Sequence, residues 1–183
     1  MKAKIVMFMG LSILLGSLSA AIADEQKAPE AAGLQAAFAD AVWDGKAVPN
    51  GQQCQKFGGK DPATPSLTVS NIPAGANAII MEYGDRDYEQ MDKGGHGKIG
   101  YRIEAGTSEV AIPSVPGHSL EVPEGFFVVA AHKAPSWDKE GAYLPPCSGG
   151  NGNRYGVTVK AVSQPEGGEA SVLGEVNLAF GRY

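Results

Sequence analysis

The chain has 183 residues, of which 43% are hydrophobic and 19% are charged, and its formal net charge at pH 7 is −5. This length is sufficient for one domain with a substantial core. An acidic chain without a basic stripe has no means of neutralising a phosphate backbone, which excludes nucleic-acid binding as the function.

Residues 1–23 have the pattern of a cleavable export signal. Lys2 and Lys4 precede a short apolar run, and the small-residue triplet Ala21-Ile22-Ala23 follows it. This order is typical of a secretory signal peptide, and the run is too short for a membrane span. We therefore predict cleavage near Ala23, a mature net charge of −7 after loss of both lysines, and a periplasmic or secreted protein without a transmembrane segment.

After the signal, residues 24–33 are polar and rich in alanine, and we expect a flexible leader. Residues 34–183 then form a single predicted domain. At its start, Leu34, Phe38 and Val42 recur every four residues and end before Asp44-Gly45, which predicts a short amphipathic helix over 34–43.

From there the pattern changes to short β-rich runs. They are separated by turn clusters that use many of the 25 glycines and 12 prolines, as in an all-β sandwich or barrel. No internal repeat or second domain is visible. The predicted strands cover residues 66–72, 76–83, 97–103, 108–113, 125–132, 154–162 and 175–183.

The two cysteines predict a disulfide. Cys54 and Cys147 form an even count in an exported chain, and their spacing matches neither a zinc ribbon nor a redox pair. The bond would tie the segment before the first core strand to a proline-rich loop.

Residues 81–101 hold the densest cluster of polar side chains. Asp85 and Asp87 bracket Arg86, and His96 follows Gly94-Gly95. From the residues alone, this pattern favours a tight turn capped by the two aspartates, with Arg86 paired to a nearby carboxylate.

The remaining sequence offers little catalytic chemistry. His118 and His132 are expected to be surface or edge-strand polar residues, and the histidine spacings do not match a metal site. Ser148 lies in a glycine-rich loop without an assignable base, and the lysine of a phosphate-binding loop is absent. We predict no catalytic residue, metal or cofactor. A hydrolase stays a distant alternative, because carboxylates and one histidine can assist water.

The order of "LTVSNIPAG", "MEYGDRDYEQMDKGGHGKIGYRI" and "KEGAYLPPCSGGNGNRYGVTVKAV" resembles the exported bacterial form of the phosphatidylethanolamine-binding proteins, also called the Raf kinase inhibitor family. The resemblance covers roughly residues 54–183. Asp85 and Asp87 match the family's Asp-Pro-Asp motif, and His96 matches its ligand-facing histidine. Tyr143 to Cys147, which includes Pro146, is similar to its Gly-Pro-x-Pro-Pro loop. Asn153-Arg154-Tyr155 replaces its His-Arg-Tyr.

The resemblance implies a mainly β fold, an antiparallel Greek-key sandwich with a few short peripheral helices. It also implies a small pocket at one end of the sheet that accepts phosphate-like anions or phospholipid head groups. The residues implied to bind the ligand are Asp85, Asp87, His96, Tyr143, Pro146, Asn153 and Tyr155. With the resemblance included, a binding site at Asp85 and Asp87 is favoured over a simple capped turn.

Three departures change the expected pocket. Arg86 replaces the proline and adds a charge, Gly94-Gly95 replaces a bulky aromatic residue, and Asn153 replaces a histidine. One titrating imidazole is left, so we expect anion affinity to rise as the pH falls from about 7.5 to 5.5, where an unperturbed histidine gains its proton.

Two functions follow. The first is a non-enzymatic, exported binding protein for a small anionic ligand or a phospholipid head group. The alternative is an inhibitor or interaction protein that binds an exported enzyme through loops around the same pocket.

Overall fold

A computed structural model describes residues 33–165 and 168–183. The predicted signal peptide and all but the last residue of the predicted leader lie outside this range. Within it, no helix has the length and apolar character needed to cross a membrane.

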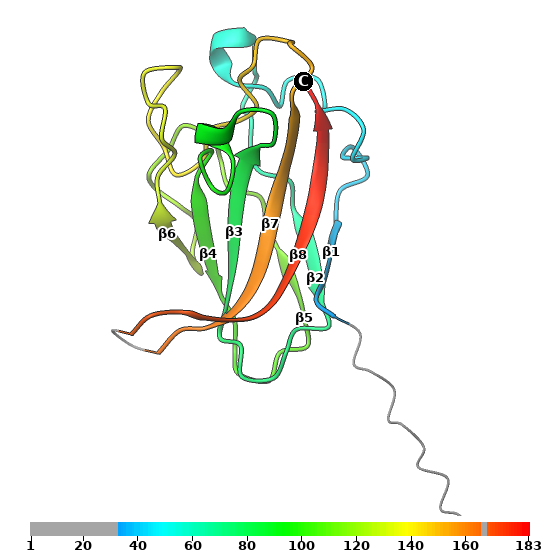
Figure 1. The fold of residues 1–183 in the computed structure, drawn as a ribbon, viewed down its shortest axis with the longest axis vertical. Coiled ribbons are helices and arrows are strands. Elements are labelled where there is room, and N and C mark those ends of the chain that lie inside the picture. The colour runs from blue at the N-terminus through cyan, green and yellow to red at the C-terminus, as the bar shows by residue number, and fades with distance from the viewer. Residues whose placement is uncertain (1–32, 166–167) are drawn as a thin grey trace, which may run out of the picture. The chain divides into compact units, whose positions relative to one another are not determined.

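The domain is built from two antiparallel sheets (Figure 1). The smaller has the order β1-β2-β5 and the larger has the order β6-β4-β3-β7-β8. Their bounds are β1 Gln35–Phe38, β2 Leu67–Ser70, β3 Ala78–Asp85, β4 Lys98–Arg102, β5 Glu109–Ile112, β6 Phe126–Ala130, β7 Arg154–Ser163 and β8 Ser171–Arg182.

All seven predicted strands are present, and the expected sandwich is confirmed. The chain changes sheet after β2, after β4 and after β5. It then returns from β6 at the edge to place β7 beside β3. These connections between strands that are not consecutive are the kind that a Greek-key arrangement requires.

The centre of the larger sheet explains its sequence. β3 pairs with β4 on one side and with β7 on the other, and seven of its eight residues are buried. A strand covered on both faces reads as a continuous apolar run rather than as an alternation. The run Ile79-Ile80-Met81 at the middle of β3 follows this rule.

The predicted helix over 34–43 is wrong, because residues 35–38 form strand β1. Ala36 pairs with Val69 and Phe38 with Leu67. Val42, the last residue of the predicted apolar face, is 56% exposed and therefore does not belong to a buried face. Ladder hydrogen bonds to β2 outweighed a weak helical period that covered fewer than three turns.

One core fills the space between the sheets. Aromatic rings concentrate near the end of β8, where the Trp43 ring centroid lies 5.3 Å from that of Phe180 and 6.1 Å from that of Phe38. Tyr83 joins the cluster 6.0 Å from Phe180. Together they close the sandwich beneath the loops that carry the polar residues.

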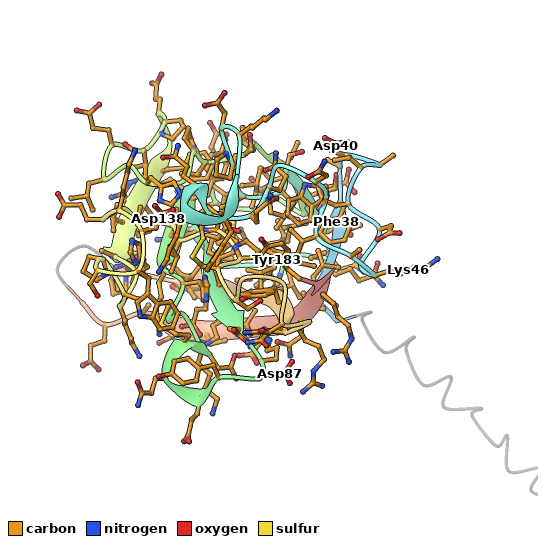
Figure 2. All side chains as sticks on the ribbon, turned by 90° about the horizontal axis from the view of Figure 1, so that it is seen from above. Phe38, Asp40, Lys46, Asp87, Asp138 and Tyr183 are labelled. Atoms are coloured by element: carbon orange, nitrogen blue, oxygen red, sulfur yellow. A yellow bond between two sulfur atoms is a disulfide. The ribbon has the colours of Figure 1, made fainter. Side chains whose placement is uncertain are left out.

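Two short 3-10 helices, η1 (Gln55–Phe57) and η2 (Glu89–Met91), lie at that end of the sandwich, together with Tyr183 (Figures 1 and 2). A second buried cluster, formed by Cys54, Met91, Ala134, Leu144 and Cys147, lies under these loops. The predicted disulfide between Cys54 and Cys147 is present in it, with Cα atoms 5.2 Å apart.

We expect the disulfide to stabilise the domain strongly, because it closes a segment with a sequence separation of 93 residues. A loop of that length is worth up to about 4 to 5 kcal/mol in the chain-entropy description of the unfolded state. Urea denaturation of a Cys54→Ala/Cys147→Ala variant measures the loss. An unfolding midpoint equal to that of the oxidised protein would contradict the prediction.

Candidate functional site

A pocket of about 350 Å³ lies among the loops at this end of the sheet. It includes both aspartates of the Asp-Arg-Asp turn, and we call it the Asp85 pocket. Its lining residues are Lys56, Phe57, Asp85, Asp87, Tyr88, Trp137, Cys147, Ser148, Asn151 and Asn153.

Asp85 lies at the last position of β3 and is 3% exposed. Its Oδ1 accepts a hydrogen bond from the backbone N–H of Asp87 at 3.0 Å, so it caps the turn as the residues alone predicted. Its Oδ2 accepts one from Asn153 Nδ2 at 2.7 Å. The two interpretations of this motif are therefore compatible, because one carboxylate holds the turn and lines the pocket.

Asp87 is held by Arg154, the first residue of β7. The backbone N–H of Arg154 donates to Asp87 Oδ2 at 2.7 Å, and Nε donates to Oδ1 at 2.9 Å. These hydrogen bonds lower the pKa of Asp87 to about 2. The paired carboxylate fixes the position of the β3–η2 turn relative to β7.

Arg86 points away from the Asp85 pocket, although it lies between the two aspartates. Its guanidinium is paired with Asp92 and also donates to Thr158 Oγ1 at 3.2 Å. The predicted pairing of Arg86 with a nearby carboxylate is confirmed. The positive charge that Arg86 was expected to add beside the site lies instead at a different cavity, which is described below.

His96 is buried next to the pocket but does not line it. Its Nδ1 lies 2.7 Å from the carbonyl oxygen of Leu144. Because a carbonyl can only accept, Nδ1 carries the proton and Nε2 is an acceptor. Nε2 has no hydrogen-bond partner among the described residues. The ring meets that of Tyr155 edge-on, with centroids 5.3 Å apart.

The expectation that His96 titrates as an unperturbed histidine is wrong. Burial lowers its pKa to about 4, and the Leu144 carbonyl and the charge of Asp85 oppose this only in part. Near neutral pH the imidazole is therefore neutral and offers no free N–H to an anion. The expected rise of anion affinity between pH 7.5 and 5.5 loses its basis.

Three other predicted residues support the pocket from behind it. Tyr155 is buried, and its hydroxyl accepts a hydrogen bond from the backbone N–H of Cys147 at 3.3 Å. The carbonyl of Pro146 accepts one from Cys54 at 2.9 Å. Tyr143 packs in the core, its ring centroid 4.9 Å from that of Tyr83. None of the three lines the pocket.

Several lining residues were not predicted. Tyr88 and Trp137 form an aromatic wall, with ring centroids 5.8 Å apart, and the Lys56 ammonium lies 5.5 Å from the centre of the Phe57 ring. Lys56 and Phe57 follow Cys54 closely, so the predicted disulfide already places them beside the proline-rich loop. Nothing in the sequence around Trp137 indicates that it lines a pocket.

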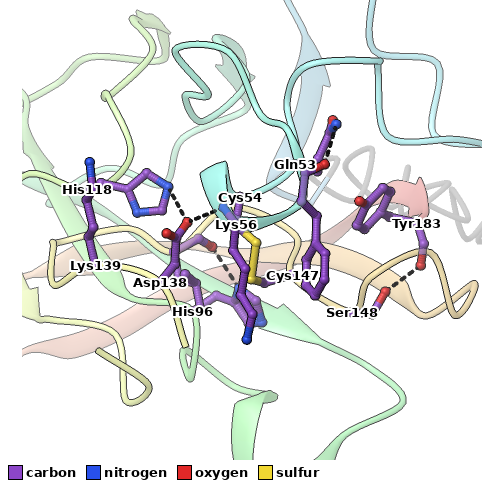
Figure 3. Close-up of a disulfide and its surroundings, with 12 residues drawn as sticks. Gln53, Cys54, Lys56, His96, His118, Asp138, Lys139, Cys147, Ser148 and Tyr183 are labelled. Carbon is purple, nitrogen blue, oxygen red and sulfur yellow. Dashed lines mark hydrogen bonds and ion pairs between the residues drawn. A yellow bond between two sulfur atoms is a disulfide. The ribbon is translucent and has the colours of Figure 1, made fainter. Parts of the chain in front are cut away.

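The expectation that His118 and His132 are surface or edge-strand polar residues is wrong, because both side chains are largely buried and neither lies in a strand. His132 is buried, and its Nε2 lies 2.8 Å from the carbonyl oxygen of Lys139. His118 Nε2 lies 3.1 Å from Asp138 Oδ2, and both side chains are largely buried (Figure 3). Burial lowers the pKa of both imidazoles. Within residues 33–165 and 168–183, no group of three His, Cys, Asp or Glu side chains could hold a metal ion.

A solved structure shares this architecture. Escherichia coli YbcL, described as a new member of the mammalian PEBP family, matches with a TM-score of 0.54 at 18% sequence identity, covering 83% of this chain and 98% of that one. The chain has the phosphatidylethanolamine-binding-protein fold. CT736 from Chlamydia trachomatis D/UW-3/CX, described as a PEBP homologue, gives a TM-score of 0.49 at 18% identity over 82% of this chain and 97% of that one.

No protein-family model and no curated protein matches the chain by sequence. The resemblance drawn from the short motifs is thus confirmed for the fold.

We expect His96 to make the stability depend on pH. The unfolded histidine takes up a proton near pH 6.5 and the folded one only near pH 4. The stabilisation is therefore complete above pH 6.5 and is lost as the pH falls toward 4, by up to about 3 kcal/mol. The variant His96→Asn, which keeps an N–H for the Leu144 carbonyl, should lose less stability than the wild type over this interval.

Denaturant unfolding of both proteins at pH 7, 5.5 and 4.5 tests this. The aspartates and glutamates titrate in both proteins, so the difference between the two slopes isolates His96. Equal slopes would refute the prediction.

Proposed function

We propose that the protein is an exported, non-enzymatic binding protein whose Asp85 pocket takes a small phosphate-bearing ligand of the phospholipid head-group type. Of the two ligand kinds considered from the sequence, we infer that a head group with both a phosphate and an ammonium is preferred over a bare anion. The observation that supports this preference is that carboxylates and aromatic rings line the same pocket.

The charges of the pocket argue against a bare phosphate. Two carboxylates, Asp85 and Asp87, face one lining cation, Lys56. At 4 Å, two like charges repel by about 4 kcal/mol at the effective dielectric constant near a protein surface. Arg154 offsets the charge of Asp87, but among the described residues no arginine or lysine forms an ion pair with the Asp85 carboxylate. An anion alone therefore meets repulsion at the base of the pocket.

The same groups suit an ammonium. The Tyr88 and Trp137 rings can present the faces that attract cations, an interaction worth roughly 0.5 to 2 kcal/mol. Asp85 can accept a hydrogen bond from the ligand in addition to those it accepts from the protein. Lys56, Asn151 and Asn153 provide donors that a phosphate needs. A zwitterionic head group uses both sets.

Binding without turnover is part of the proposal. Ser148, the only lining hydroxyl besides Tyr88, donates its proton to the carbonyl of Tyr183 at 2.7 Å. The acceptor atom of His96, Nε2, has no hydrogen-bond partner among the described residues and so makes no contact of this kind with Ser148. The two side chains therefore do not form the nucleophile–base pair that covalent catalysis uses. Release of inorganic phosphate from phosphoethanolamine over hours would contradict this part.

Ligand binding can be read from one fluorophore. The chain has two tryptophans, of which Trp43 is buried in the core and Trp137 lines the pocket. In a Trp43→Phe background, phosphoethanolamine should change the Trp137 emission at lower concentration than ethanolamine or inorganic phosphate. Equal midpoints for phosphoethanolamine and phosphate would overturn the preference for a zwitterion.

Asp85→Asn should have opposite effects on the binding of the ammonium and phosphate groups of the ligand. Asparagine keeps an acceptor for the turn but removes the negative charge. We expect phosphoethanolamine to bind more weakly and inorganic phosphate to bind more tightly, as measured by the same Trp137 signal. A thermal melt checks that the variant is folded. A loss of affinity for both ligands in a folded variant would contradict the assigned role of Asp85.

Tyr88 tests the aromatic wall. Tyr88→Leu removes the ring and keeps apolar bulk, and we expect affinity for phosphoethanolamine to fall by about threefold or more. Tyr88→Phe is the matched control, because it keeps the ring and removes only a hydroxyl that donates to Gln90. Equal affinities of the two variants would show that the ring does not contact the ligand.

A further inference from the structure

A second cavity, of about 520 Å³, lies on the other side of the Asp87–Arg154 pair. It is formed by the loop at residues 45–46, by the turn after β3, by the N-terminal end of β7 and by the C-terminal end of β8. We call it the basic pocket. Its lining residues are Gly45, Lys46, Arg86, Arg154, Tyr155, Asn177, Leu178, Ala179, Gly181 and Arg182.

Four of these ten residues are cationic and none is acidic. Arg86 and Arg154 are paired with Asp92 and Asp87, which lie outside the lining. Lys46 and Arg182 are within ion-pair distance of no carboxylate of residues 33–165 and 168–183. Such a concentration of positive charge is notable in a chain whose net charge is −5.

The backbone holds the two unpaired cations at this site. The N–H of Arg182 donates to the carbonyl of Lys46, and the N–H of Val48 donates to the carbonyl of Arg182, both at 3.0 Å. The Arg182 guanidinium donates to the carbonyl of Gly152 at 2.8 Å, which leaves most of its N–H groups free. In Figure 2, Lys46 reaches outward at the rim of this end of the molecule.

Arg86 is fixed more firmly. Its guanidinium is anchored by Asp92 and Thr158, and it passes beside Gly156. A Cβ at position 156 would lie 2.7 Å from the carbonyl oxygen of Leu178 and 3.6 Å from Arg86 Nε. The glycine therefore lets the strands and this side chain approach closely, so the cation is positioned before any ligand arrives.

We propose that the basic pocket is a second ligand site, distinct from the Asp85 pocket, that binds a phosphate group. Arginine guanidinium groups match phosphate oxygens with paired N–H donors, and Lys46 adds a mobile charge. Tyr155 and Leu178 add apolar surface for a substituent on the phosphate. The group can belong to a small phosphomonoester or to an anionic lipid, and the experiment below separates these sources.

The test compares two double variants that remove the same charge. Lys46→Gln/Arg182→Gln removes the two unpaired cations of the pocket. Lys60→Gln/Arg102→Gln removes an exposed lysine and an exposed arginine elsewhere. Calorimetric titration with inorganic phosphate and with glycerol phosphate should show at least a tenfold loss of affinity in the first variant and less than a twofold change in the second. Equal losses in both variants would overturn the proposal.

The location is read by amide shifts in two-dimensional NMR during the phosphate titration. Shifts of Lys46, Ala179 and Gly181 are expected, and they do not depend on the occupancy of the Asp85 pocket. Shifts confined to Ser148, Asn151 and Asn153 would place the phosphate in the Asp85 pocket and overturn this inference. A failure of phosphoethanolamine to change Trp137 emission would count against the proposed function alone.

Co-sedimentation with vesicles separates the two sources. Vesicles of phosphatidylglycerol and of phosphatidylcholine are compared for the wild type and both double variants. Loss of sedimentation with phosphatidylglycerol in Lys46→Gln/Arg182→Gln alone identifies a lipid phosphate. Binding of glycerol phosphate without sedimentation identifies a soluble phosphomonoester. The absence of both kinds of binding overturns the proposal.

Discussion

The Cys54–Cys147 bond is the constraint on which the candidate site depends. It joins the segment before β2 to the loop after Pro146, two stretches that share no ladder of strand hydrogen bonds. The carbonyl of Pro146 and the N–H of Cys54 reinforce the junction. Because the bond fixes both loops, Lys56 and Phe57 on one side face Ser148 and the residues after it on the other. The rigid sheet below supplies Asp85 to the lining, and Tyr155 supports the Cys147 backbone from behind it, so the loop-built pocket has a fixed base.

Most of the fold could be predicted because the residues of most strands, and of the turns around them, indicate a strand without reference to the rest of the chain. The run 78–85 reads as a strand through its apolar residues, and the glycine- and proline-rich turns mark where strands end. Residues 35–38 could not be predicted in this way. They are four residues long, and they form a strand because Ala36 and Phe38 find partners in β2, which is information that the segment itself does not contain.

The residues of the candidate site likewise fall into those that the sequence could predict and those that it could not. Asp85, Asp87 and Asn153 could be predicted because they follow motifs of fixed spacing, and the structure brings them together. Tyr143 and Pro146 lie in a predicted loop, but the loop faces the core, and sequence does not reveal which way a buried loop turns. Trp137 belongs to a connection whose course depends on the whole packed domain. The protonation of His96 depends on burial, which no local pattern reports.

The Arg154–Asp87 ion pair lies between the two cavities, because Arg154 lines the basic pocket and Asp87 lines the Asp85 pocket. If both proposed sites bind their ligands, this ion pair couples them electrostatically, because the Arg154 guanidinium can neutralise only one anion fully at a time. An anion that attracts Arg154 on one face leaves Asp87 less neutralised on the other, where a cation then binds more tightly. Thermodynamic reciprocity requires the converse by the same factor. With ligands in both proposed sites, the single ion pair would make their binding cooperative without any rearrangement of the sheets.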